Sequence, residues 1–258
     1  MGGVARRATA IEYLREQAGN AVLVLDAGNT LFGQRLAMAS KGQIIVEAMN
    51  AMEYDAMAIG TLDLSQGIEV LKERAQQAHF AILSCNLLDL NGRPIFTPYI
   101  IVPREGLRCG IVGVSEPEAA NLADIAQSAK IVDPVESVQK YLSEIRDQSD
   151  VLIVLSHLGL EQDKALAQVI PEIDLIVGGR TRRLLRAPEI VGSTIIVQAG
   201  YDGEWLGKLN VTITTDGKAV DPWVDIIPLG PEIADHPELA ALVARYNELY
   251  PAPTPGAR

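Results

Sequence analysis

A regular alternation between short apolar runs and segments of helical length constrains the fold of this sequence most. Continuous apolar runs that end in small or polar residues are typical of buried parallel strands that enter loops. Six such runs occupy residues 21–29, 54–60, 80–86, 150–159, 173–179 and 193–200. Helices are predicted over residues 41–52, 68–78, 134–148, 162–169 and 236–248. This alternation predicts a layered α/β fold with parallel strands.

Two further segments have the pattern of antiparallel hairpins. Residues 99–114 turn at Arg104-Glu105-Gly106, and residues 206–229 alternate in hydropathy and turn at Asp216-Gly217. A chain of 258 residues can bury the core of one large α/β domain, and two small domains are the alternative. We expect a single domain over residues 1–250, followed by a Pro-rich tail or linker over residues 251–258.

Charge and apolar patterning exclude some classes of protein. The net charge of −11 argues against a general nucleic-acid-binding protein, because phosphate backbones need a basic face. Binding of small anionic ligands is not excluded, because such ligands respond only to the local electrostatic field. No apolar run approaches the roughly 20 residues of a membrane-spanning helix, so no membrane span is expected. The first residues have the pattern of an amphipathic helix and not of a signal peptide. Localisation stays open, with the cytoplasm as the default.

The two cysteines lie in apolar runs of strand-like pattern. Cys85 and Cys109 are expected to be buried, reduced thiols. A disulfide between them is the alternative if their strands are neighbours.

Small and polar residues gather at the ends of the predicted strands. In α/β folds, ligands bind in the loops beyond the carboxyl ends of parallel strands. All six runs end in such residues, which predicts one shared rim as the functional site. The candidate residues at this rim are Asn29, Thr61, Asp63, Asn86, His157, Arg180 and Arg182.

The order of the loop motifs carries a resemblance to a known family. The motifs LVLDAGNT, IGTLDLSQG, LSHLG, VGGRTR and QAGYDGEWLGKL follow one another along the chain. In this order the chain resembles the catalytic domain of the 5′-nucleotidase family of metallophosphoesterases, from Gly2 to about Pro228. The resemblance implies a calcineurin-like αββα sandwich, with mixed sheets flanked by helices and two metal ions at the strand ends. It also implies that the first strand of the family is missing here.

The residues that hold the metal ions in that family are mostly replaced in this sequence. The family's DxH motif is absent, and its GD motif is Gly28-Asn29. Its GNHE motif is Gly-Thr-Leu-Asp at residues 60–63, its SHxG motif is kept at residues 156–159, and its GHxH motif is Gly-Arg-Thr-Arg at residues 179–182. A guanidinium has no lone pair for a metal ion, and one histidine with one asparagine does not hold two dications. We therefore expect no catalytic residue, no metal ligand and no cofactor.

Two interpretations of the arginines follow from these replacements. Arg180 and Arg182 either take over the charge of the metal ions and bind a phosphate or carboxylate, or they are neutralised or solvated. In the second case they pair with Asp26, Asp63 or Asp202, or point into solvent.

The remaining basic groups also have competing interpretations. His157 is either a residual ligand or acid–base group, or a structural imidazole hydrogen-bonded at a strand end, and the structural role is favoured. Arg183 and Arg186 are expected to be surface charges.

The predicted function is that of a catalytically degenerate, metal-free metallophosphoesterase-like domain with a binding, scaffolding or regulatory role. Its partner would be a small anion, a nucleotide or another protein, and its old pocket would be an anion site. The alternative is an active metal-dependent phosphoester or nucleotide hydrolase, whose ligands come from a missing N-terminal segment or a partner chain. A third interpretation is a domain of a longer assembly, with the Pro-rich tail leading to a partner. The resemblance also implies a separate C-terminal domain with the nucleoside-binding aromatics, beyond this sequence.

Overall fold

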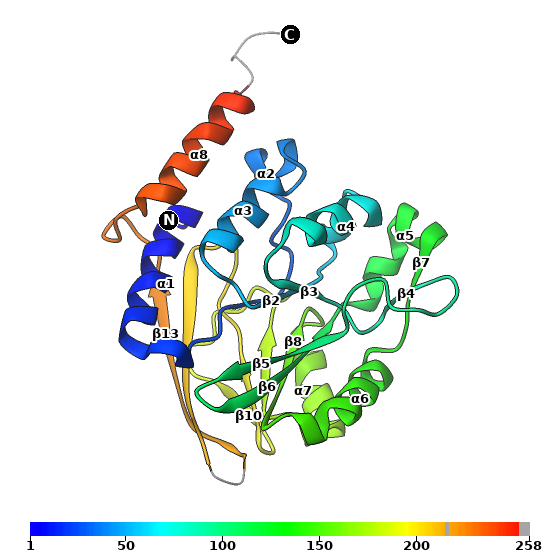
Figure 1. Cartoon of the computed structure of the whole chain (residues 1–258). Coiled ribbons are helices and arrows are strands. Elements are labelled where there is room, and N and C mark those ends of the chain that lie inside the picture. Colours follow the sequence, from blue (N-terminus) through cyan, green and yellow to red (C-terminus); the bar gives the residue numbers. More distant parts are fainter. Residues whose placement is uncertain (215–216, 253–258) are drawn as a thin grey trace.

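The computed structural model describes residues 1–214 and 217–252 and arranges them in layers of helices and sheets (Figure 1). A three-stranded parallel sheet has the order β1-β2-β3, and a six-stranded mixed sheet has the order β10-β11-β9-β8-β6-β5. The first sheet consists of β1 (Leu25–Asp26), β2 (Ala56–Ala58) and β3 (Ala81–Leu83). The second consists of β5 (Tyr99–Arg104), β6 (Leu107–Val114), β8 (Val151–Ser156), β9 (Leu175–Gly178), β10 (Glu189–Val191) and β11 (Thr194–Val197). The predicted layered α/β fold with mixed sheets flanked by helices is confirmed.

Successive side chains along the strands of the second sheet point alternately into two cores, because neighbouring residues of a strand face opposite sides of the sheet. Ile111, Ile153 and Leu155 pack with Ala58 and other residues of the first sheet in a core between the sheets. Their neighbours Val112 and Val154 face a second core beneath the helices. The two sheets approach closely at Gly113, where an added Cβ would lie 2.3 Å from the Cβ of Leu83.

Helices cover the outer face of each sheet. α3 (Gln43–Ala51), α4 (Ile68–Gln77) and α1 (Val4–Ala18) contribute to a core against the first sheet. α6 (Pro134–Ile145) and α7 (Leu160–Val169) cover the second sheet. The remaining helices are α2 (Arg35–Ala39), α5 (Ala123–Ser128) and α8 (Pro237–Leu249), and short 3-10 turns occupy Gly19–Ala21, Leu62–Leu64, Pro117–Asn121 and Arg146–Gln148. Helix α6 begins as its sequence predicts, with Asp133 accepting a hydrogen bond from the Glu136 amide at 2.9 Å.

Two smaller β-pairs complete the fold. β12 (Trp205–Ile213) and β13 (Ala219–Pro228) form the predicted late hairpin, and the Asp216 half of its predicted turn lies outside the described residues. β4 (Leu87–Asp89) and β7 (Ala129–Ile131) pair antiparallel and were not predicted. Most of the predicted tail over residues 251–258 also falls outside the described residues.

One predicted strand is much shorter than expected. The run 21–29 was predicted as one continuous buried strand, but the strand is limited to β1. The chain turns directly after it because Asp26 Oδ1 accepts hydrogen bonds from the Gly28 amide at 2.9 Å and the Thr30 hydroxyl at 2.5 Å. Such local side-chain bonding favours a loop over a continued strand.

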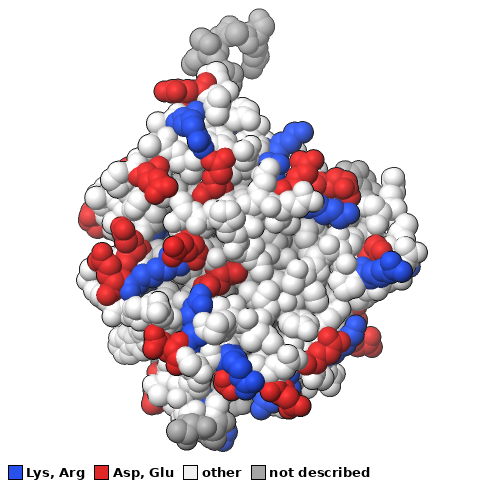
Figure 2. Space-filling view, in the orientation of Figure 1, with Lys and Arg blue, Asp and Glu red and all other residues white. Residues whose placement is uncertain are grey.

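Three general expectations can be compared with the structure. Cys85 and Cys109 are both buried and free, as expected for core thiols. Acidic and basic side chains are interspersed on the face in Figure 2, which has no continuous basic surface. Among the described residues, no helix combines the length and apolarity that crossing a membrane requires.

Candidate functional site

The carboxyl ends of the parallel strands border a cavity of about 970 Å³. Its walls come from the loops that follow β1, β9 and β11, from the start of α1, and from β12 and β13. The cavity brings together four of the predicted site residues, Asn29, His157, Arg180 and Arg182. Thr61, Asp63 and Asn86 do not line it.

A second cavity, of about 770 Å³, lies at the amino ends of β2 and β3. Its two arginines are already bound to the protein. Arg104 pairs with Asp55, and Arg15 lies 3.3 Å from Glu53 and donates to the Met52 carbonyl at 2.7 Å. We therefore place the candidate site in the larger cavity.

Asp63 fixes the loop that carries Asn29. Its Oδ2 accepts hydrogen bonds from the amides of Asn29 at 2.7 Å and Gly60 at 2.9 Å. Its Oδ1 accepts from the amides of Thr30 and Leu31, both at 2.9 Å. Burial raises the pKa of Asp63 to about 6, although these backbone donors favour the ionised form. Because both oxygens are engaged, Asp63 acts as an anchor for the loop and not as a ligand for a cavity occupant.

Asn29 and His157 converge on Gly60. Asn29 adopts a left-handed backbone conformation with φ 62°, which asparagine tolerates, and its Oδ1 accepts from the Leu62 amide at 2.7 Å. A Cβ on Gly60 would lie 2.3 Å from Asn29 Oδ1 and 2.7 Å from His157 Nε2. Only glycine fits between these two groups.

His157 is a buried neutral imidazole. Its side chain is 1% exposed, and Nδ1 donates to the Ala27 carbonyl at 2.6 Å. Burial lowers the pKa of His157, so the ring is uncharged near neutral pH. With the proton on Nδ1, Nε2 carries the lone pair, and it has no hydrogen-bond partner among the described residues.

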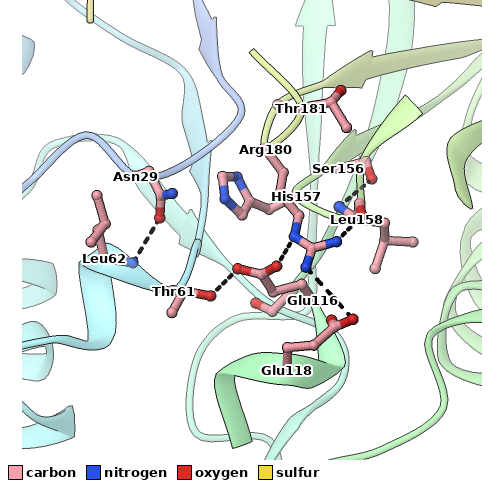
Figure 3. Close-up of polar contacts among 12 residues, drawn as sticks. Asn29, Thr61, Leu62, Glu116, Glu118, Ser156, His157, Leu158, Arg180 and Thr181 are labelled. Atoms are coloured by element: carbon pink, nitrogen blue, oxygen red, sulfur yellow. Dashed lines mark hydrogen bonds and ion pairs between the residues drawn. The ribbon is translucent and has the colours of Figure 1, made fainter. Parts of the chain in front are cut away.

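Arg180 is held by carboxylates that the sequence interpretation missed (Figure 3). Its Nε pairs with Oε2 of Glu116, its Nη2 lies 3.6 Å from Oε1 of Glu118, and its Nη1 donates to the Leu158 carbonyl at 3.2 Å. Thr61 donates its hydroxyl proton to Oε1 of Glu116. The expected pairing with Asp26, Asp63 or Asp202 is therefore wrong in its partner, although the expectation of an ion pair is correct.

The signal for Glu116 was present in the sequence. It follows β6 in the stretch VSEPE, but β6 was interpreted only as one arm of an antiparallel hairpin. In the structure β6 also pairs in parallel with β8, from Cys109 opposite Val151 to Val114 opposite Ser156. The carboxyl end of β6 therefore reaches the same rim as His157.

Arg182 and Asn86 occupy very different positions. Arg182 is exposed, lines the cavity and has its guanidinium carbon 5.9 Å from the ring centroid of Tyr201. Asn86 is completely buried, and its side chain exchanges hydrogen bonds with the Ser115 backbone, at 2.9 Å to the amide and 2.8 Å to the carbonyl. Asn86 therefore joins two loops behind the site. Arg183 and Arg186 are exposed, as predicted for surface charges.

Gln198 fixes the arginine-bearing loop and was also missed as a site residue. Its Nε2 donates to the Gly179 carbonyl at 2.6 Å, and its Oε1 accepts from the Thr181 hydroxyl at 2.8 Å and the Arg183 amide at 2.9 Å. Gln198 is 3% exposed. These bonds hold the loop in the geometry that directs Arg180 toward Glu116.

The donor set at this rim does not fit a pair of divalent metal ions. Two such ions need several anionic or imidazole donors at once. His157 Nε2 and Asn29 Oδ1 are directed to one place, but Asp63 is engaged by backbone amides and Arg180 has no lone pair. Within residues 1–214 and 217–252, no group of three or more His, Cys, Asp or Glu side chains is placed to hold a metal ion.

Comparison with known proteins gives the wider context of this geometry. No family model matches the chain. A snake venom 5′-nucleotidase of Naja atra is 30% identical over 269 residues, which cover 95% of this chain and 51% of that protein. The chain thus spans about half the length of the curated relatives that it matches.

Solved structures agree with this similarity. A 5′-nucleotidase precursor from Thermus thermophilus superposes with a TM-score of 0.87 at 27% identity, over 96% of this chain and 53% of that chain. The calcineurin-like phosphoesterase YfkN from Bacillus subtilis superposes with a TM-score of 0.85 at 22% identity, over 96% of this chain and 89% of that chain, which bears on the fold alone. The chain has the fold of the calcineurin-like phosphoesterases, and its homologues are 5′-nucleotidases and other metallophosphoesterases.

Proposed function

We propose that this chain is a catalytically degenerate, metal-free relative of the 5′-nucleotidases with a binding or regulatory role. The observation that carries the proposal is the position of Arg180, whose guanidinium is fixed by Glu116 on the loop where the family carries imidazoles. The guanidinium offers no lone pair to a metal ion at a position where an imidazole would offer one. Without such ions, neither the polarisation of a phosphoryl group nor the generation of a hydroxide nucleophile is supplied.

The ligand of this domain is proposed from the cavity and from the relatives together. The relatives are named for acting on nucleotides, and the cavity of about 970 Å³ is large enough for a nucleotide-sized molecule. A small anion, a nucleotide or a segment of another protein are the classes that we propose for this cavity, with the exposed Arg182 as a cationic group that lines it. The chain spans only about half the length of these relatives, so the nucleotide is proposed here as a class of ligand and not carried over as a substrate.

Elemental analysis and a phosphatase assay test the proposal. Protein purified without chelators should contain Mn, Zn, Fe and Co well below one equivalent per chain. It should not release p-nitrophenol from p-nitrophenyl phosphate or bis(p-nitrophenyl) phosphate after Mn²⁺ is added. Metal-dependent turnover that disappears in a His157→Ala variant would refute the degenerate state, whereas turnover that persists in this variant would indicate a contaminant.

The alternative function is an active hydrolase that is completed by a further segment or another chain. The orphaned Nε2 of His157, beside Asn29 Oδ1, favours this alternative because a buried imidazole lone pair is a good metal donor. Under this proposal the chain binds Mn²⁺ only in the completed assembly. Metal content measured on the chain co-purified from its native source, against the isolated chain, separates the two functions.

A further inference from the structure

The carboxylate of Glu116 is held in the way that a protein holds a bound oxyanion. One oxygen pairs with Nε of Arg180, and the other accepts the hydroxyl proton of Thr61 (Figure 3). The side chain of Glu116 is 5% exposed. Glu118, in contrast, lies 3.6 Å from the same guanidinium with its side chain 58% exposed.

The groups that surround Glu116 are those that recognise phosphate. A guanidinium and a hydroxyl donate to tetrahedral oxyanions as readily as to carboxylates. The third nitrogen of the guanidinium, Nη1, already donates to the Leu158 carbonyl. Each of the three guanidinium nitrogens of Arg180 thus faces an acceptor group of the protein itself. The anion-binding position predicted from the sequence is therefore occupied by the carboxylate of Glu116.

The local charge also opposes a free anion. Arg180 contributes one positive charge, and Glu116 and Glu118 together contribute two negative charges, so the cluster carries a net negative charge. An incoming phosphate would have to displace a buried, doubly bound carboxylate and approach a second one. Both carboxylates oppose a further anion, Glu116 more than Glu118, because the side chain of Glu118 is largely exposed to solvent.

We propose that Glu116 is a specificity-determining residue, which occupies the oxyanion position on Arg180 and excludes free phosphate, sulfate and phosphomonoesters from it. The position accepts such an anion only when the carboxylate is removed or displaced. The inference rests on the proposed metal-free state of the site, because a metal pair would itself attract phosphate.

The Glu116→Ala variant tests the inference directly. It leaves a carboxylate-sized space against Nε of Arg180 and the hydroxyl of Thr61. Phosphate at several times its dissociation constant should raise the melting temperature of this variant by about 2–4 °C. The unmutated chain should show only the small general stabilisation that phosphate gives any protein. Sodium chloride at equal ionic strength corrects for screening.

Two control variants locate the effect. Glu118→Ala removes the same formal charge but opens no space against Nε of Arg180, and it should respond to phosphate like the unmutated chain. Adding Arg180→Ala to Glu116→Ala should abolish the extra response. A phosphate response of Glu116→Ala equal to that of the unmutated chain, or one that survives Arg180→Ala, would overturn the inference.

A second variant covers a folding failure. If Glu116→Ala does not fold, Glu116→Ser opens the same space with a short polar side chain, and phosphorus-31 line broadening should report phosphate binding to it but not to the unmutated chain. The absence of broadening in Glu116→Ser would then count against the inference. The metal content of the same samples is also measured. Stoichiometric metal would overturn the proposed metal-free function. A metal-free variant that does not bind phosphate would overturn only the proposed role of Glu116.

Discussion

Several side chains at the site form hydrogen bonds to the chain's own backbone. Both carboxylate oxygens of Asp63 accept hydrogen bonds from backbone amides. The side-chain amide of Gln198 bonds to two backbone groups and to the Thr181 hydroxyl. His157 Nε2 is a buried exception, because its lone pair has no partner in the described part of the chain. Residue types alone do not distinguish these roles, since an aspartate at a strand end serves equally as a ligand or as an anchor.

Replacing Asp63 by asparagine should weaken the fold. An amide nitrogen cannot accept hydrogen bonds, so two of the four backbone amides now bound to Asp63 lose their acceptor. We expect a loss of about 2–4 kcal/mol in the free energy of unfolding, measured by urea denaturation. Asp202→Asn, at an exposed position of the rim, is the matched control and should change stability by less than about 0.5 kcal/mol. Equal effects of the two substitutions would contradict the anchoring role.

The tautomer of His157 can be observed directly. Because burial lowers its pKa and Nδ1 donates to the Ala27 carbonyl, the ring should be neutral with its proton on Nδ1 at pH 8, and it should take up a second proton only below its usual pKa. Long-range nitrogen-15 correlation spectra distinguish the two ring nitrogens. A ring that becomes doubly protonated above its usual pKa near 6.5 would contradict the assignment.

Helices and strands differ in how far the sequence predicts them. α4, α6, α7 and α8 lie close to their predicted ranges, because their apolar faces repeat with helical period. β1 is shorter than its apolar run, since Asp26 bonds to the following loop. The pairing of β6 with β8 depends on contacts between distant residues, so the hairpin pattern could not reveal that Glu116 reaches the rim. Seven of the rim residues were named from sequence, and four of them line one cavity.

The loop after β9 should loosen when Gln198 is replaced by alanine. The substitution removes hydrogen bonds to Gly179, Thr181 and Arg183 that fix this loop. The Arg183 amide should then exchange its hydrogen at least about tenfold faster. Gln162→Ala, at an exposed position of α7, should leave this exchange rate unchanged. Unchanged exchange in Gln198→Ala would show that the loop holds its conformation by other means.

At the scale of the whole molecule, a buried acid links stability to pH. Asp163 is completely buried, and Ser156 donates to its Oδ1 at 2.5 Å, while Oδ2 has no partner among the described residues. Burial raises its pKa from 3.8 to about 7. The folded state therefore binds a proton that the unfolded state releases between these two values. This contribution to stability is complete below the unfolded pKa and is lost as the pH rises through about 7.

The Asp163→Asn variant isolates this contribution. The unmutated chain should melt at a higher temperature at pH 5.5 than at pH 8, and the variant should show a smaller difference because its side chain is neutral at both. At pH 8 the variant should be at least as stable as the unmutated chain, since the amide can still accept from Ser156. Melting curves across this range check both expectations, and an identical pH dependence in the two proteins would contradict them.

The exposed arginines of the loop after β9 form a locally basic region on an acidic molecule. Arg182, Arg183 and Arg186 are exposed on a chain whose total charge is −11. Anionic partners are repelled during their approach from most directions and attracted near this loop. The attraction of an anionic partner to these arginines would therefore act only at short range, because dissolved ions screen exposed charges over distances of about 10 Å.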